Sequence, residues 1–196
     1  LDKENYIQVF LLAVLLVFMA IYVILCPKYT FKEIAMTFTG LVYVTMMLSC
    51  LYQVRCMNGG VYLVWIVFIA AWGSDTCAYC VGKLIGKHKL PTKLSPKKTI
   101  EGCTGGVVGA MLIAGIYAYI FKEPLAEHGC SVALFTIVGG LGAICSQIGD
   151  LAASAIKRNY EIKDYGTLIP GHGGIMDRFD SILFTAPLAF IFFTFL

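Results

Sequence analysis

Charged residues are scarce in this sequence. Aspartate, glutamate, lysine and arginine make up 14% of its 196 residues, whereas 59% are hydrophobic and the mean hydropathy is +0.80. A soluble domain carries about 25% charged residues, because its surface faces water. The scarcity excludes an ordinary soluble domain and indicates a membrane protein. The net charge of +3 is also too small to suggest nucleic acid as a partner.

Two familiar signals are absent as well. Cys77 and Cys80 form a Cys-x-x-Cys pair, but no second pair or suitably spaced histidines accompany them, which argues against a zinc site. No basic segment with a cleavage site opens the chain, so we expect no signal peptide. Because the sequence begins with Leu1, we expect the native chain to have further membrane spans upstream.

Long apolar segments dominate what is present. A helix needs roughly 20 apolar residues to cross ~30 Å of hydrocarbon, and about six segments meet this length. They are residues 6–26, 34–52, 61–81, 105–121, 131–156 and 179–196. We therefore predict an all-α, polytopic integral membrane protein, with residues 1–196 forming a single transmembrane catalytic domain.

Basic residues alternate between the connections. Lysine and arginine gather in residues 27–33, 82–104 and 157–178, whereas residues 53–60 and 122–130 carry few. Since cytoplasmic loops are enriched in these residues, we expect the first three connections to lie in the cytoplasm. Small residues in the fourth and fifth segments, with Gly105-x-x-x-Gly109 as an example, predict close helix packing rather than chemistry.

Polar side chains concentrate in residues 149–180, between the last two apolar segments. Asp150, Ser154 and Lys157 are spaced to share one helical face, and Asp177 and Asp180 share another. Counting inward from both segments brings these carboxylates to a similar depth at the cytoplasmic boundary. If the two helices are neighbours, the carboxylates can share a cation.

The glycines around His172 form a segment that cannot be a regular helix, and they let backbone amides approach an anion closely. Carboxylates hold divalent cations, while amides and cationic side chains hold phosphate. The stretch 149–180 therefore predicts phosphoryl or nucleotidyl transfer.

An ionisable residue also lies inside the third apolar segment. Asp75 is about 14 residues, or ~21 Å at 1.5 Å per residue, from the outer boundary. One interpretation is a carboxylate paired with a lysine for assembly. The other, which we prefer, is that Asp75 lines a polar cavity open to the cytoplasm.

The motifs of this stretch resemble the signature of phosphatidate cytidylyltransferases, also called CDP-diacylglycerol synthases. The matching runs are Ser154-x-Ile156-Lys157-Arg158, Lys163-Asp164-x-Gly166 and Ile169-Pro170-x-His172-Gly173-Gly174-Ile175-x-Asp177-Arg178-Phe179-Asp180. The resemblance implies an integral membrane enzyme that joins CTP and phosphatidate into CDP-diacylglycerol, with Mg²⁺, and releases pyrophosphate. It further implies contact with membrane lipids and a place in a bacterial inner membrane, with the active site facing the cytoplasm. The number of metal ions and a homodimer are left open.

A second run, Ser95-Pro96-Lys97-Lys98-Thr99-Ile100-Glu101-Gly102, resembles another motif of this family. Taken alone, lysines beside a membrane indicate attraction to anionic lipid. The resemblance makes Ser95, Lys98 and Glu101 candidates for nucleotide or phosphate contact. A third run, Asp75-Thr76-x-Ala78-Tyr79, also resembles a motif of this family.

We assign roles on this basis. Metal ligands are Asp150 and Asp177, with Asp180 as a third catalytic carboxylate. Candidates for phosphate and substrate contact are Lys157, Arg158, Lys163, Arg178 and Ser154. For His172 we prefer phosphate donation to proton transfer, with a structural role also open. Asp164 is a substrate-site residue that either orients Lys163 or reaches the metal through water.

Two other functions fit part of the pattern. A CTP-dependent polyprenol or phytol kinase would share basic loops and metal carboxylates. A transporter would explain an intramembrane aspartate and glycine-broken helices. Charge concentrated at one interface argues against the transporter, and the complete His-Gly-Gly-x-x-Asp-Arg-x-Asp pattern favours the cytidylyltransferase.

Overall fold

The structure is a computed structural model and describes residues 5–92, 94–95, 98–166 and 173–196. Every element of these residues is helical, apart from an isolated antiparallel bridge between Lys89 and Thr99. The all-α prediction is therefore confirmed for the described part of the chain. The chain divides into two compact units, Leu1–Met46 and Met47–Leu196. This division does not test the prediction of one catalytic domain, which stays a prediction.

The first unit contains α1 (Asn5–Leu25) and the first half of α2 (Phe31–Cys56). Aromatic side chains join the two helices, since the rings of Phe18 and Phe38 meet edge to face with centroids 5.9 Å apart. A reciprocal cap starts α2: the Thr30 amide donates to the Glu33 carboxylate, and the Glu33 amide donates to the Thr30 hydroxyl. Apolar side chains on the exposed faces suit a lipid environment.

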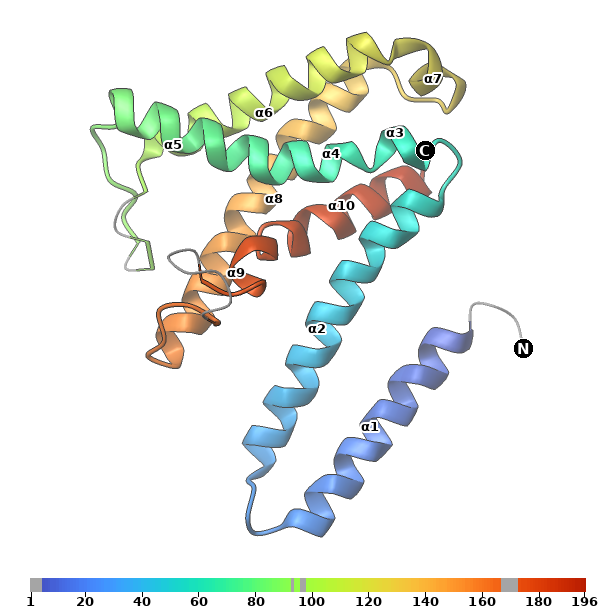
Figure 1. Cartoon of the computed structure of the whole chain (residues 1–196), viewed down its shortest axis with the longest axis vertical. Coiled ribbons are helices and arrows are strands. Elements are labelled where there is room, and N and C mark those ends of the chain that lie inside the picture. The colour runs from blue at the N-terminus through green and yellow to red at the C-terminus, as the bar shows by residue number, and fades with distance from the viewer. Residues whose placement is uncertain (1–4, 93, 96–97, 167–172) are drawn as a thin grey trace. The chain divides into compact units, whose positions relative to one another are not determined.

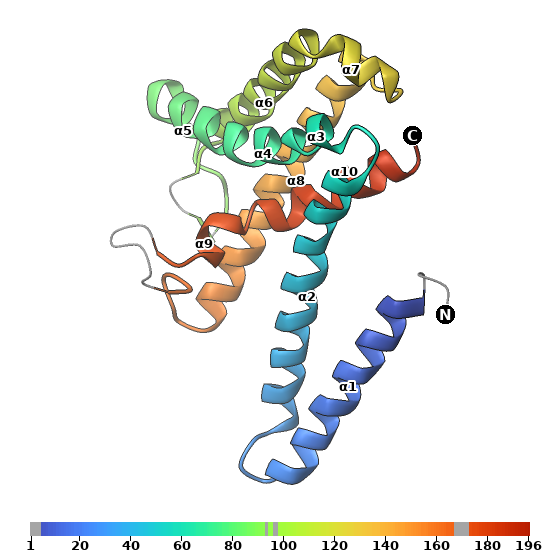
Figure 2. The ribbon, with the colours of Figure 1, turned by 45° about the vertical axis from the view of Figure 1, so that its right-hand side comes forward.

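The second unit holds the rest of α2 and the elements that build the site (Figures 1 and 2). They are α3 (Gly60–Leu63), α4 (Trp65–Phe68), η1 (Ile69–Gly73), α5 (Ser74–Ile85), α6 (Ile100–Ile120), α7 (Lys122–Glu127), α8 (Val132–Asn159), α9 (Met176–Phe179) and α10 (Ile182–Thr194). Helix α5 packs along α6, and α8 packs against both α6 and α10. The buried core between them includes Ile66, Phe135 and Ile182.

Four helices of the described residues are long and apolar enough to cross a membrane: Phe31–Cys56, Gly60–Ile85, Ile100–Ile120 and Val132–Asn159. The remaining two predicted segments coincide with the shorter apolar helices Val9–Leu25 and Ile182–Thr194. All six apolar segments are thus helical near the predicted positions, but a count of six spans is not confirmed. The last helix is shorter than predicted, since α10 begins only at Ile182, after Asp180 and Ser181, where the Asp180 carboxylate accepts the Ser181 amide.

The third span is not a regular helix. Residues Ile69–Gly73 form a π-helical turn immediately before Ser74 and Asp75. A π turn changes the direction of the side chains that follow it and is frequent at functional sites. It is tied to the C-terminal region, since Trp72 Nε1 donates to the Arg178 carbonyl at 3.5 Å. The sequence analysis did not predict this turn.

Small residues allow close helix contact, as predicted. A Cβ atom at Gly105 would lie 2.6 Å from the Val81 side chain, and one at Gly139 would lie 2.6 Å from Ala114 Cβ. Either distance is too short for real carbon atoms, so a larger residue at these positions would push the helices apart. These glycines therefore serve packing.

We expect Gly139→Ala to lower the free energy of unfolding by about 1–3 kcal/mol, because the added methyl overpacks the α6–α8 contact. Gly40→Ala is a matched control, since nothing lies within 4 Å of the position that its Cβ would take. Alanine is also the better helix former there, so this variant should be no less stable. Thermal unfolding in detergent compares the two, and equal melting temperatures would contradict the packing role of Gly139.

Candidate active site

The loop between α5 and α6 places Lys98 at the start of α6. The Leu90 amide donates to the Lys98 carbonyl, and the Ile100 amide donates to the His88 carbonyl. The Thr99 hydroxyl then caps α6 by accepting the Gly102 amide at 3.1 Å. These bonds fold the two sides of the loop together and fix the backbone at Lys98.

Glu101 helps to close the same loop. Its carboxylate accepts the His88 amide, and His88 Nδ1 lies 2.5 Å from Glu101 Oε1. The structure therefore gives Glu101 a partner within the loop. Its predicted contact with substrate stays a prediction.

Lys98 reaches the centre of the candidate site from this loop. Its Nζ atom lies 2.5 Å from Asp150 Oδ2, which α8 supplies. Both side chains are partly exposed, at 24% and 29%, so the ion pair remains accessible to a ligand. The structure thus joins the lysine of one motif to a carboxylate of the polar stretch 149–180.

Three carboxylates from different elements form an acidic cluster, defined here as Asp75, Asp150 and Asp180. Asp150 interacts electrostatically with both of the others, and Asp75 interacts with Asp180. Asp75 also accepts a hydrogen bond from the Ser181 hydroxyl at 3.3 Å. Asp180 is buried, so its charge depends on nearby cations rather than on water. Such a cluster attracts positive charge, which Lys98 supplies in this structure.

Asp177 lies outside the acidic cluster and has its own set of partners. Its Oδ1 atom lies 2.8 Å from Lys157 Nζ, while Oδ2 accepts the amides of Tyr165 and Gly174 at 2.8 and 2.9 Å. Burial raises the pKa of this carboxyl, but the bonds from Lys157, Gly174 and Tyr165 outweigh burial and hold the pKa below its usual value. Asp177 therefore ties the segment before α9 to the end of α8.

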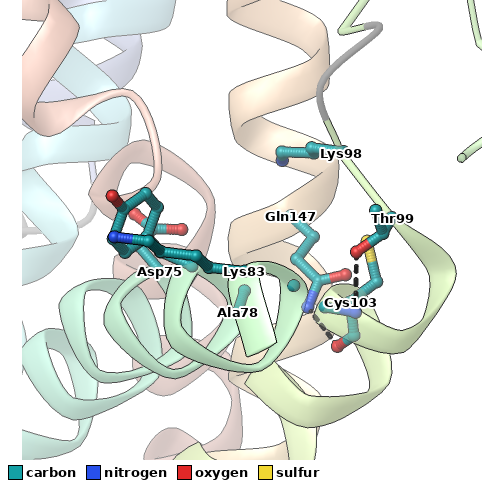
Figure 3. A pocket seen from close by; sticks show the side chains of 10 residues that line it. Asp75, Ala78, Lys83, Lys98, Thr99, Cys103 and Gln147 are labelled. Atoms are coloured by element: carbon teal, nitrogen blue, oxygen red, sulfur yellow. Dashed lines mark hydrogen bonds between the residues drawn. The ribbon is translucent and has the colours of Figure 1, made fainter. Parts of the chain in front are cut away.

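A cavity of about 420 Å³ opens between α5, α6 and α8 (Figure 3). We call it the larger cavity because it exceeds the second cavity that predicted site residues line. Its charged lining residues are Asp75, Lys83 and Lys98. Gln147 extends from α8 and donates through Nε2 to the Cys103 carbonyl at 2.9 Å. The remaining lining is Ala78, Tyr79, Gly82, Thr99, Gly102 and Cys103.

A second cavity of about 280 Å³, the smaller cavity, lies between the end of α8 and the connections around residues 94–95 and 163–164. It gathers six of the predicted site residues from two motifs: Ser95, Ser154, Lys157, Arg158, Lys163 and Asp164. Leu94 completes the lining. With three basic side chains against one acidic side chain, this cavity suits a polyanion.

Among the predicted site residues, Arg178 lines neither cavity, and two polar residues near the site were not predicted from the sequence. Arg178 lies on α9, where its carbonyl binds Trp72. His172 lies outside the described residues. Sequence reasoning missed Gln147 and Ser181, although a polar Gln147 within an apolar segment, three residues before Asp150, was a visible signal.

The fit of a metal ion can be judged from the donor set. Carboxylates are the ligands that Mg²⁺ prefers, so the chemistry of the acidic cluster suits it. Across the described residues, however, no three acidic, histidine or cysteine side chains converge on a common metal position. Lys98 binds Asp150 and Lys157 binds Asp177 instead. The predicted metal ligands Asp150 and Asp177 therefore stay predictions.

The described residues form apolar helices, and they set an acidic cluster near a cavity whose basic lining suits a polyanion. These features define a polytopic membrane protein with a site suited to phosphate groups. The chain belongs to the cytidylyltransferase family, whose model matches residues 2–196. The resemblance drawn from the motifs is thereby confirmed.

Named relatives agree with the family. The chain is 36% identical over 191 residues to a phosphatidate cytidylyltransferase of Bacillus subtilis, covering 96% of this chain and 68% of the relative. It is 37% identical over 161 residues to one of Staphylococcus saprophyticus, with 82% and 59% coverage. It is 34% identical over 167 residues to one of Thermotoga maritima, with 85% and 62% coverage. The chain thus spans about three fifths to two thirds of the length of these relatives.

Proposed function

We propose that this chain, within its full-length protein, transfers CMP from CTP to phosphatidate and so forms CDP-diacylglycerol and pyrophosphate. The observation that carries the proposal is the Lys98–Asp150 ion pair, which stands between a basic polar cavity and a largely apolar one. A water-soluble triphosphate and a membrane lipid need such different surroundings. The names of the relatives support the same reaction.

The proposed reaction depends more on the positions of the two substrate phosphates than on a general base. An oxygen of the phosphatidate phosphate attacks the α-phosphorus of CTP, a new P–O bond forms, and the bond to pyrophosphate breaks. A phosphate monoester is already largely ionised near neutral pH, with a second pKa of ~6, so no strong general base is required. Neutralising charge and aligning the two phosphates supply most of the rate. Lys98, Lys157 and Arg158 are the groups placed to do this.

Mg²⁺ is part of the proposal. Asp150, which is predicted from the sequence as a ligand, would hold it once Lys98 releases the carboxylate. Asp177, the other ligand predicted from the sequence, would first have to release Lys157 and two backbone amides. A bound Mg²⁺ would neutralise phosphate oxygens as a Lewis acid.

The orientation of the site is also proposed. Because cytoplasmic loops are enriched in lysine and arginine, the Lys98 loop and the end of α8 would lie in the cytoplasm, where CTP is available. The membrane would be the cell membrane of a bacterium, since the relatives are bacterial.

Purified full-length protein incubated with labelled CTP and phosphatidate tests the reaction directly. Lipid-linked CMP supports the proposal. Phosphorylated polyprenol, formed when a polyprenol is supplied, would indicate the related kinase instead. Absence of any transfer from CTP would overturn both enzymatic readings and favour transport.

We expect Lys98→Ala to lower turnover by about a hundredfold or more, the usual effect of removing one group that stabilises transition-state charge. Lys89→Ala is the control, because Lys89 lies in the same loop, is exposed and removes the same charge. A role in attracting anionic lipid would make the two losses equal and small, at about 1 kcal/mol of surface attraction each. Equal turnover of the two variants would therefore remove Lys98 from the site. The neighbouring Lys97 lies outside the described residues.

A further inference from the structure

The two cavities differ in what surrounds them. The larger cavity lies among three apolar helices, and on α5 the side chains of Leu84 and Ile85 next to it are 82% and 60% exposed. Exposed apolar side chains on a membrane helix face hydrocarbon. The smaller cavity is lined from the end of α8 and from the connections around residues 94–95 and 163–164. The surface beside the larger cavity therefore suits lipid, and the surface beside the smaller cavity suits water.

We propose that the larger cavity is the phosphatidate subsite, with Lys83 binding the lipid phosphate at its rim, and that the smaller cavity receives the triphosphate of CTP. This assignment rests on the proposed function and adds which substrate each cavity takes.

The rim of the larger cavity suits a lipid phosphate. Lys83 Nζ lies over the ring of Tyr79 at 5.9 Å from its centroid, and the Tyr79 side chain is itself 69% exposed. A lysine and a tyrosine together at the end of a membrane helix occupy the level of lipid headgroups. A phosphate bound by Lys83 on α5 would face Lys98, which lines the same cavity from the loop before α6 (Figure 3), while its acyl chains stay along the apolar surface of α5.

The smaller cavity suits a triphosphate and excludes acyl chains. Lys157, Arg158 and Lys163 supply cations, and Ser95 and Ser154 supply hydroxyl groups. Arginine binds two phosphate oxygens at once, which favours a polyphosphate over a single charge. The exposed side chains of Arg158 and Lys163 also place this cavity toward water.

The two subsites meet at Asp150. Lys98 lines the larger cavity and pairs with Asp150, and Ser154 of the smaller cavity follows Asp150 by one helical turn. Four residues of α-helix rise about 6 Å. Reacting phosphates held in the two cavities therefore approach each other across this turn of α8.

Crossed kinetics of the full-length enzyme test the assignment. We expect Lys83→Ala to raise the KM for phosphatidate in mixed micelles about tenfold and to leave the KM for CTP within twofold. Lys163→Ala should do the reverse. Lys87→Ala is the matched control, because it is an exposed lysine four residues from Lys83 and does not line the cavity. A rise in the KM for CTP in Lys83→Ala, or equal effects of Lys83→Ala and Lys87→Ala, would overturn the proposal.

Protection of single cysteines from alkylation tests the assignment of the two cavities without measuring enzyme activity. In full-length protein that retains Cys103 and no other cysteine, dioctanoyl phosphatidate should slow modification of Cys103 by N-ethylmaleimide, whereas CTP should not. With Cys103 replaced by alanine and Ser95→Cys introduced, CTP should protect and phosphatidate should not. Protection in the opposite sense, or by neither substrate, would contradict the assignment. If the wild-type protein transfers no CMP, the proposed function fails; if it does and protection is reversed, only the assignment of the cavities fails.

Discussion

Asp150→Asn should reduce CMP transfer by about a thousandfold while leaving the protein folded in detergent. The substitution keeps the size of the side chain and removes the charge that attracts Lys98 and, in the proposed reaction, Mg²⁺. Lys98 would lose its ion pair, but its side chain is 24% exposed and can regain water. Catalysis depends on charge placed at the reacting phosphates, so turnover should fall much further than stability.

Turnover across a Mg²⁺ titration and thermal unfolding should be measured on the same preparations. Glu127→Gln is the control, because it removes an exposed carboxylate from α7, away from both cavities. Partial rescue of Asp150→Asn at high Mg²⁺ would support a metal role for Asp150. Turnover near that of the wild type would remove Asp150 from the site.

Asp177→Asn should have a different outcome, which is loss of stability. The change would remove the nearest counter-charge of Lys157, and the side chains of Lys157 and Asp177 are only 14% and 5% exposed. Removing one partner of such a pair costs about 3–5 kcal/mol, because a buried charge is left uncompensated. The amides of Tyr165 and Gly174 would also exchange a charged acceptor for a neutral one. We expect a large drop in melting temperature and, with it, in activity.

The double variant Lys157→Met with Asp177→Asn is the informative control. It removes both charges, so it should recover part of the stability that Asp177→Asn loses, although activity stays low. A stable but inactive Asp177→Asn would instead support the metal-ligand role predicted from the sequence.

The stability that Asp177 provides should depend on pH in one direction. Its pKa is lowered in the folded state, so its contribution is fully present above the unfolded value of ~3.9 and is lost as pH falls through the lower folded value. The difference in melting temperature between wild type and Asp177→Asn should therefore be constant near neutral pH and shrink in acid. A difference that grows as pH falls would contradict the ion-pair role.

The contrast between Asp150 and Asp177 shows where motif reasoning stops. Both carry the same charge in the stretch 149–180, and both were predicted from the sequence to bind the metal, although only Asp177 belongs to the family signature. In the structure, Asp150 pairs with Lys98 and its side chain is 29% exposed, whereas both oxygens of Asp177 accept hydrogen bonds within the protein and its side chain is 5% exposed. A motif specifies which residues occur and at what spacing. It does not specify which hydrogen-bond and ion-pair partners each side chain has in the folded protein.

By itself, the sequence determined the family, the helical class, the approximate positions of the apolar segments and the face of α8 that carries Asp150, Ser154 and Lys157. These properties depend on composition and on spacings within one helix, which are local. Tertiary structure alone decided that Lys98 meets Asp150, that a π turn precedes Asp75, and that Gln147 reaches across to α6. Such contacts depend on how separate helices pack, and packing follows from the fit of many small and large side chains together rather than from any one motif.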